Sequence, residues 1–80
     1  MIYKVKAEEI SFTTANTVYD SNLVRVYAAA DSVVTVTTSG DAVVGSITIA
    51  GGSSELLEKD FTDTLTATST ISAVPVAYRT

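Results

Sequence analysis

Four carboxylates form the densest group of side chains in this sequence that could do chemistry. They are Glu55, Glu58, Asp60 and Asp63. Carboxylate oxygens at short spacing are the ligands that Ca²⁺ prefers, and Glu58 with Asp63 could act as general acid and base in glycoside cleavage. The spacing lacks the Asp-x-Asp/Asn-Gly progression of an EF-hand loop, and acid–base catalysis requires a deep cleft. We therefore expect a solvated acidic loop with Lys59 as its local partner.

Other catalytic chemistry is excluded by residue type. The 80 residues contain no histidine and no cysteine. Their absence rules out Ser/His/Asp triads, thiolate nucleophiles and zinc or iron–sulfur centres ligated by this chain. Gly51 and Gly52 precede neither a Lys-Ser/Thr pair nor a helical pattern, so they indicate a turn and not a phosphate loop. We expect no enzymatic activity, no cofactor and no metal.

Aromatic and basic side chains remain as candidates for binding. Tyrosine rings offer large, rigid contact areas that could stack on a sugar or a partner, although in small β domains they more often cap the core. The tyrosines are Tyr3, Tyr19, Tyr27 and Tyr78. The basic residues Lys4, Lys6 and Arg25 could form a patch against an acidic neighbouring subunit, or they could be scattered surface charges.

Composition points to a folded domain that binds neither nucleic acid nor membranes. The chain is 46% hydrophobic and 18% charged, with nine acidic and five basic residues and a net charge of −4. That apolar content exceeds what disordered chains carry, and the negative charge repels phosphates. No apolar run approaches the roughly 18 residues of a membrane span, and the N-terminus lacks a signal-peptide pattern. We expect one domain over residues 1–80 that stays soluble where it is made.

The elements that would position these side chains are predicted to be strands. Valine, isoleucine and threonine make up 29 of the 80 residues, and branched side chains favour pleated sheets. Alternating patterns predict strands at Ile2–Lys6, Glu9–Thr14, Thr17–Asp20, Leu23–Ala29, Ser32–Thr38, Ala42–Ala50, Glu55–Lys59 and Thr70–Arg79. The Ser39–Asp41 connection predicts a bulged hairpin with Gly40 in the left-handed conformation. The expected fold is all-β: a small single-domain sandwich or barrel of about seven or eight short antiparallel strands.

The C-terminal half contains the less regular segments. Residues 54–60 favour a strand, predicted at 55–59, over a single helical turn, because seven residues are too few for a stable isolated helix. Residues 60–67 read as an irregular loop or a single turn, anchored in the core by Phe61 and Leu65. Pro75 cannot donate to a ladder, which places the last strand at a sheet edge or at a bulge.

The predicted core is thin and contains no disulfide. Its members are Val5, Ile10, Phe12, Val24, Val26, Val34, Val36, Ile47, Ile49, Leu57, Leu65, Ile71, Val74 and Val76. A small apolar β domain with few charges is well stabilised when its edges and flat faces are covered by copies of itself or by a larger lattice. The composition therefore favours an assembly component and a homo-oligomer.

Several segments between Leu23 and Tyr78 resemble a family of small β proteins encoded by tailed bacteriophages, particularly those of marine bacteria and cyanobacteria. The similar segments are Leu23–Ala29, Val33–Thr37, Gly45–Gly52, Leu57–Leu65 and Val74–Tyr78. In that family a valine-rich hairpin is followed by a glycine turn, an acidic strand ending in Glu-Lys, a Thr-Asp-Thr-Leu-like turn and a last strand closing in Ala-Tyr.

The resemblance implies a non-enzymatic virion structural protein. We expect a capsid decoration or cement protein that assembles in the host cytoplasm, binds the major capsid protein or another virion protein, and forms trimers at three-fold junctions. The expected partner interface is Ile2, Tyr3, Lys4, Lys6, Arg25, Tyr27, Gly51, Gly52 and Tyr78. Two alternatives stay open: a tail, neck or fibre component, and a free carbohydrate-binding or adhesin-like module using Tyr19, Tyr27 and Tyr78.

Overall fold

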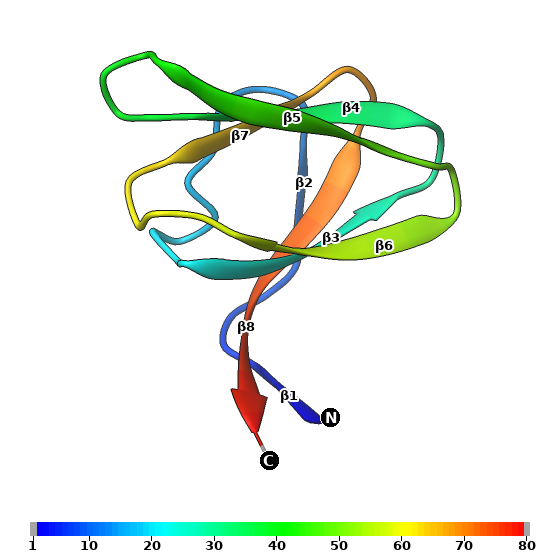
Figure 1. The fold of residues 1–80 in the computed structure, drawn as a ribbon. Coiled ribbons are helices and arrows are strands. Elements are labelled where there is room, and N and C mark those ends of the chain that lie inside the picture. The colour runs from blue at the N-terminus through cyan, green and yellow to red at the C-terminus, as the bar shows by residue number, and fades with distance from the viewer. Residues whose placement is uncertain (1, 80) are drawn as a thin grey trace.

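The computed structural model describes the backbone of residues 2–79 and the side chains of residues 4–77. In that part of the chain every regular element is a strand. The strands are β1 (Ile2–Val5), β2 (Ile10–Phe12), β3 (Leu23–Ala28), β4 (Ser32–Thr37), β5 (Val43–Ile49), β6 (Ser53–Glu58), β7 (Thr64–Ala67) and β8 (Ile71–Arg79). They form two antiparallel sheets that pack face to face (Figure 1). The predicted small all-β sandwich is confirmed.

The larger sheet is built around β8. One side of β8 pairs with β3, and β6 pairs with the far side of β3. The other side of β8 pairs first with β2, through Phe12 opposite Ile71, and then with β1, through Val5 opposite Val76. Because β3 pairs only with residues 71–75, the end of β8 continues past it with β1 as its partner, and the two form a ribbon (Figure 1).

The smaller sheet has the order β5-β4-β7. The outer side of β7 is covered by the segment that follows β2, because Asn16 and Leu65 exchange backbone hydrogen bonds of 3.1 and 2.9 Å and Ala67 N donates to Thr13 O at 3.0 Å. On the opposite side of this sheet β5 is the last strand, and within the described residues its only ladder is with β4. The strand edge of β5 is therefore open.

Pro75 lies in an inner strand and not at a sheet edge: it pairs with Val24 of β3, and on its other side the ladder is interrupted between β1 and β2. Its carbonyl oxygen accepts from Lys6 N at 3.0 Å, on the side of β8 that faces β1 and β2. The N–H that proline lacks would point to the same side, where the four residues between Val5 and Ile10 lie opposite only two residues of β8, Val74 and Pro75. The gap in the ladder accommodates the missing donor.

The predicted hairpin at Ser39–Asp41 is confirmed, with one change. Thr38 N donates to Ala42 O at 2.8 Å and closes the turn between β4 and β5. The left-handed residue is Asp41, with φ of 65°, and not Gly40. The register then shifts between Val36 and Thr37, which places a bulge in β5 just after the turn.

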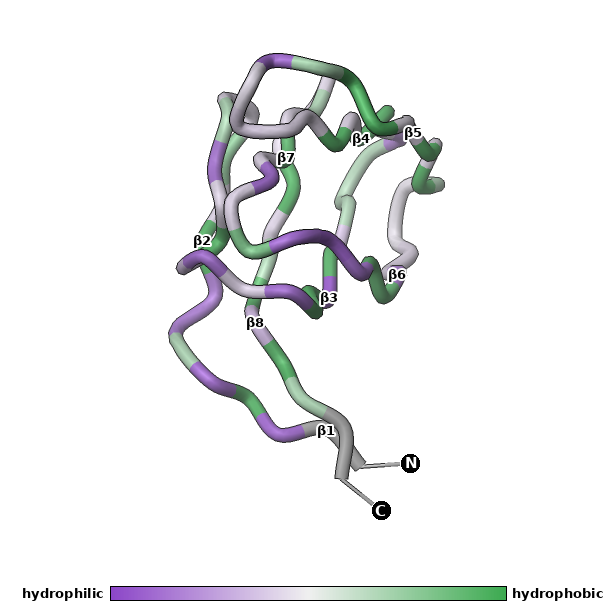
Figure 2. The backbone as a smooth tube through the Cα atoms, turned by 60° about the vertical axis from the view of Figure 1, so that its left-hand side comes forward, coloured by the Kyte–Doolittle hydropathy of each residue, from purple (hydrophilic) through white to green (hydrophobic). Residues whose placement is uncertain are grey.

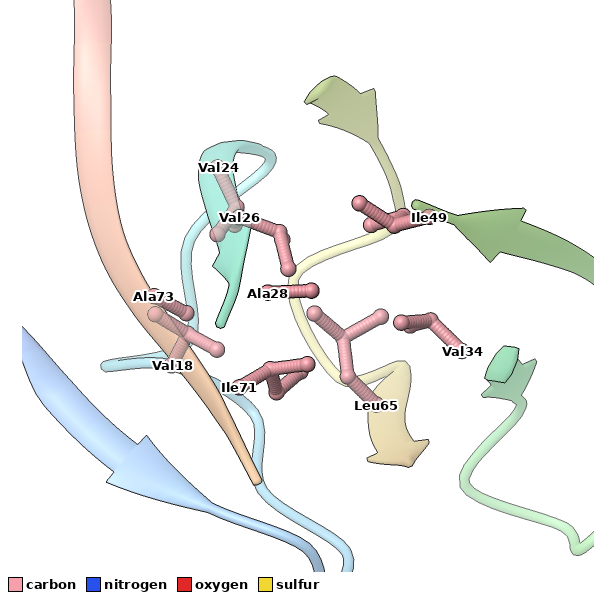
Figure 3. Close-up of a cluster of buried hydrophobic side chains, with 9 residues drawn as sticks. All are labelled: Val18, Val24, Val26, Ala28, Val34, Ile49, Leu65, Ile71 and Ala73. Carbon is pink, nitrogen blue, oxygen red and sulfur yellow. The ribbon is translucent and has the colours of Figure 1, made fainter. Parts of the chain in front are cut away.

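The core lies between the two sheets and consists of small aliphatic side chains. Its fully buried members are Val18, Val24, Val26, Ala28, Val34, Ile49, Leu65, Ile71 and Ala73. In Figure 3, Leu65 of β7 lies between Ala28 of the larger sheet and Val34 of the smaller one, so it joins the two layers. A buried side chain of this kind contributes about 1.5–3 kcal/mol relative to exposure.

Two residues predicted for the core lie outside it. Val5 is 65% exposed because it belongs to the ribbon, which extends beyond the smaller sheet. Ile47 is 38% exposed because it lines a cleft where β5 and β6 separate. The core also contains Val18, Ala28 and Ala73, which the sequence reading left out. The alanines fit where opposite strands approach closely, a feature that alternation does not reveal.

The predicted strand at Thr17–Asp20 is wrong, because this segment is a left-handed turn. Val18, Tyr19 and Asp20 have φ values of 52°, 60° and 52°. A β-branched residue in this region is strained, by on the order of 1–3 kcal/mol. The turn is held by the buried side chain of Val18, whose N–H donates to Asn16 Oδ1 at 2.7 Å and whose carbonyl accepts from Ser21 Oγ at 2.6 Å.

Residues 60–67 hold a strand where an irregular loop or turn was predicted. Thr64–Ala67 is β7, and Leu65 anchors it in the core as expected. Phe61 is 60% exposed and anchors nothing, which corrects its predicted role. The neighbouring prediction is confirmed, because residues 53–58 form strand β6 and not a helical turn.

Candidate functional site

The residues predicted to form a partner interface fall into three separate places. Ile2, Tyr3 and Lys4 lie in β1, Lys6 follows its end, and Tyr3 lies opposite Tyr78 in the ladder. Arg25 and Tyr27 share the outer face of β3, since they alternate with the buried Val24 and Val26. Gly51 and Gly52 form the turn between β5 and β6, where Gly52 N donates to Ala28 O at 2.7 Å. That turn adjoins the end of β3 farthest from β1, so the structure does not unite the predicted set.

The ribbon is the first feature suited to binding. Lys4 and Val5 of β1 and Lys6 directly after it are exposed, and alternation along the chain places the lysines on one face and Val5 on the other. Within the described residues β1 pairs only with β8, so its second edge is free. Figures 1 and 2 both show the ribbon extending away from the body of the sandwich.

A cleft beside the β5 edge is the second feature. β5 and β6 meet at the Gly51–Gly52 turn and diverge from there, which leaves a cleft of about 390 Å³ between the two sheets. Its wall on the smaller sheet is formed by Val36, Val44, Gly45, Ser46 and Ile47. Its opposite wall is formed by Glu58, Lys59, Asp60 and Asp63. One wall is therefore apolar or neutral and the other is ionic.

Lys59 is the structural centre of the ionic wall. Its side chain is only 6% exposed, and Nζ donates to Ser21 O at 2.6 Å and to Asp60 O at 3.2 Å. These bonds tie the left-handed turn before β3 to the loop after β6. Burial lowers the pKa of Lys59 below its ordinary value of 10.5, and the nearby carboxylates of Asp63, Asp20 and Asp60 oppose that shift.

The carboxylates predicted as a solvated acidic loop occupy two environments. Glu58 and Asp60 are exposed, whereas Asp63 is only 5% exposed and accepts a hydrogen bond from Asp60 N through Oδ2 at 3.3 Å. Asp63 N in turn donates to Asp60 O at 3.1 Å, so the backbone and side chain of Asp63 together close a turn with Asp60. Both members of the Glu58–Asp63 acid–base pair line the cleft, but the Asp63 carboxylate is engaged by the backbone.

Two other kinds of site are absent from the described part of the chain. In residues 2–79 no cluster of three or more acidic, histidine or cysteine side chains has the proximity that a metal ion needs. Over the same stretch there is no helix of the length and hydropathy required to cross a membrane.

The tyrosines do not converge on one described surface. Tyr19 is exposed in the left-handed turn, and Tyr27 is partly exposed on the outer face of β3. Tyr3 and Tyr78 lie opposite each other in the ribbon ladder, and their side chains lie outside the described set.

Sequence reading missed the cleft and the buried state of Lys59. The local charge pattern around Lys59 matches an exposed loop, and only the pairing of β3 with β6 reveals that Ser21 lies within reach of its ammonium group. The sequence did contain an indication of the unprotected edge of β5, because residues 42–54 include no charged side chain.

Comparison with known proteins finds no matching family model, no matching curated protein and no matching solved structure.

Proposed function

We propose that this chain is a non-enzymatic structural protein of a tailed bacteriophage particle that decorates the capsid and stabilises its lattice. The observation that carries the proposal is the combination, in one small sandwich, of a protruding ribbon with a free strand edge and an uncharged open edge on β5. Free strand edges bind extended segments of other proteins by continuing the sheet. The phage context rests on the resemblance of the segments between Leu23 and Tyr78 to small β proteins of tailed bacteriophages.

The stability of the domain supports a role within an assembly. The described core contains nothing larger than leucine or isoleucine among its fully buried members, and there is no disulfide. A domain of this size buries only roughly 60% of its unfolded surface, so cover from neighbouring subunits adds to its stability. A trimer at a three-fold junction of the lattice, in contact with the major capsid protein, would provide that cover.

Deletion of residues 1–6 from the chain tests this function in the particle. We expect the truncated chain to fold and to be lost from purified heads, because the ribbon carries a free strand edge that would hold the chain in the lattice, through the capsid or through a neighbouring copy. The exchange Phe61→Ser is the matched control, since this exposed side chain lies outside both open edges.

The readout is the copy number per particle, measured by quantitative mass spectrometry on separated heads and tails. Retention of the truncated chain at full occupancy would contradict the assigned role of the ribbon. Recovery of the intact chain with tails alone would replace decoration by a tail, neck or fibre role.

A further inference from the structure

An uncharged edge strand is unusual on a free sandwich. β5 contains no charged residue and no proline, the two devices that most often keep an exposed edge from pairing. Val43 and Val44 are both more than half exposed at its start, and Figure 2 shows strongly hydrophobic residues along this strand. Among the described residues, a bulge at its start interrupts this edge.

The ionic wall facing this edge has an excess of negative charge. Glu58, Asp60 and Asp63 contribute three carboxylates to the cleft, and Lys59 contributes the one cationic group on that wall. The ammonium group already donates to two carbonyl oxygens. A strand that enters beside β5 with cationic side chains toward the cleft would therefore meet opposite charge.

β1 has the pattern that this cleft requires. Lys4 lies in this exposed strand with a free edge, and Lys6 follows it directly and continues the pairing through its N–H to Pro75 O at 3.0 Å, so alternation places the two lysines on one face and Val5 on the other. With the lysines toward the carboxylates, Val5 would lie on the outer face of the smaller sheet, which also bears Val43 through its pairing with Thr37. Four residues of β1 span about 13 Å and the seven of β5 about 23 Å, so the acceptor edge is long enough.

We propose that β1 of one copy adds to the open edge of β5 of a second copy, with Lys4 and Lys6 facing the carboxylates of the cleft. Donor and acceptor are different surfaces, so the contact is head-to-tail. Such contacts close into rings or grow into filaments, depending on the rotation between subunits. The proposal concerns a second copy of this chain and holds whatever larger particle contains it.

A charge-exchange experiment on the full chain tests this contact by sedimentation velocity, from about 1 to 500 μM at low salt. We expect concentration-dependent oligomers that dissociate as salt is added. Reversal of the donor (Lys4→Glu with Lys6→Glu) or of the acceptor (Glu58→Lys with Asp60→Lys) is expected to weaken association at least tenfold, about the effect of placing like charges in contact.

The combined variant with all four reversals restores opposite charges and is expected to associate within about threefold of the original chain. Glu55→Lys is the matched control: this exposed residue of β6 lies outside the cleft and its reversal leaves association unchanged. Circular dichroism establishes that each variant is folded. A chain that stays monomeric throughout, oligomers insensitive to either reversal, or a folded quadruple variant without restored association would overturn the proposal. None of these results depends on binding to phage heads.

Discussion

Replacement of Lys59 by methionine probes the interaction that links the two irregular segments of the fold. Methionine keeps the apolar stem of the side chain and removes the ammonium group. The carbonyl oxygen of Ser21, in a buried residue, then loses its 2.6 Å donor, while the carbonyl of the exposed Asp60 can bind water instead. The left-handed turn before β3 loses its connection to the loop after β6.

The size of the expected loss in stability is set by the buried carbonyl of Ser21, which loses its donor. A hydrogen bond from a charged donor is worth about 1.5–3 kcal/mol, and the removed cost of burying an ammonium group offsets part of the loss. We expect the free energy of unfolding to fall by about 2 kcal/mol, which in a domain of this size lowers Tm by about 8–16 °C.

Urea unfolding followed by circular dichroism measures the change, with Lys4→Met as the control at a protein concentration where the chain is monomeric. Lys4 is exposed, so its replacement should change stability by less than about 0.5 kcal/mol. A Lys59→Met variant as stable as the Lys4→Met variant would refute the role assigned to the buried ammonium group.

Three further perturbations test the packing and the electrostatics. Because burial lowers the pKa of Lys59 in the folded chain below 10.5, the unfolded chain holds more protons between the two values; the free energy of unfolding should therefore rise with pH in that window, and Lys59→Met should lack this rise in parallel melts. Gly51→Ala places a Cβ 3.1 Å from Ala30 Cα and should destabilise by about 1–3 kcal/mol, whereas Gly45→Ala meets nothing within 4 Å; equal melting temperatures would count against the close approach. Leu65→Ala should cost about 2–5 kcal/mol and Phe61→Ala less than about 0.5 kcal/mol in chemical denaturation, and a reversed order would contradict the observed burial.

The local sequence pattern was sufficient to predict core residues where one face of a strand is buried against the core. The alternation in β3 and β4 identifies Val24, Val26 and Val34 as core residues, because a half-buried strand has a side-chain period of two. The same rule failed at Ile47, whose face of β5 turns toward a cleft. Alternation indicates a shared face but does not indicate whether another layer covers it.

Segments with unusual backbone or tertiary contacts could not be predicted in this way. Val18 has the side chain of a strand residue, yet tertiary burial, its N–H donating to Asn16 Oδ1 and its carbonyl accepting from Ser21 Oγ hold it in a left-handed turn. β7 was missed because its two inward residues, Leu65 and Ala67, are too few to distinguish a strand from a turn.

The two open edges give a physical reason for an assembly role. An uncharged edge on a monomer is an aggregation hazard, and natural sandwiches usually protect it with charge or proline. This chain instead has charged residues on a separate ribbon and on the wall opposite the edge. That distribution fits an edge that is covered in use by a specific strand.

The proposed role in capsid decoration is tested most directly by the binding of the purified chain to tailed-bacteriophage heads prepared without this chain. The chain is titrated onto the heads, and bound and free fractions are separated by sedimentation. A role in decoration predicts saturable binding with copies on the order of hundreds per head, set by the lattice symmetry. Absence of binding, even at chain concentrations well above those at which other capsid proteins bind, would contradict this role.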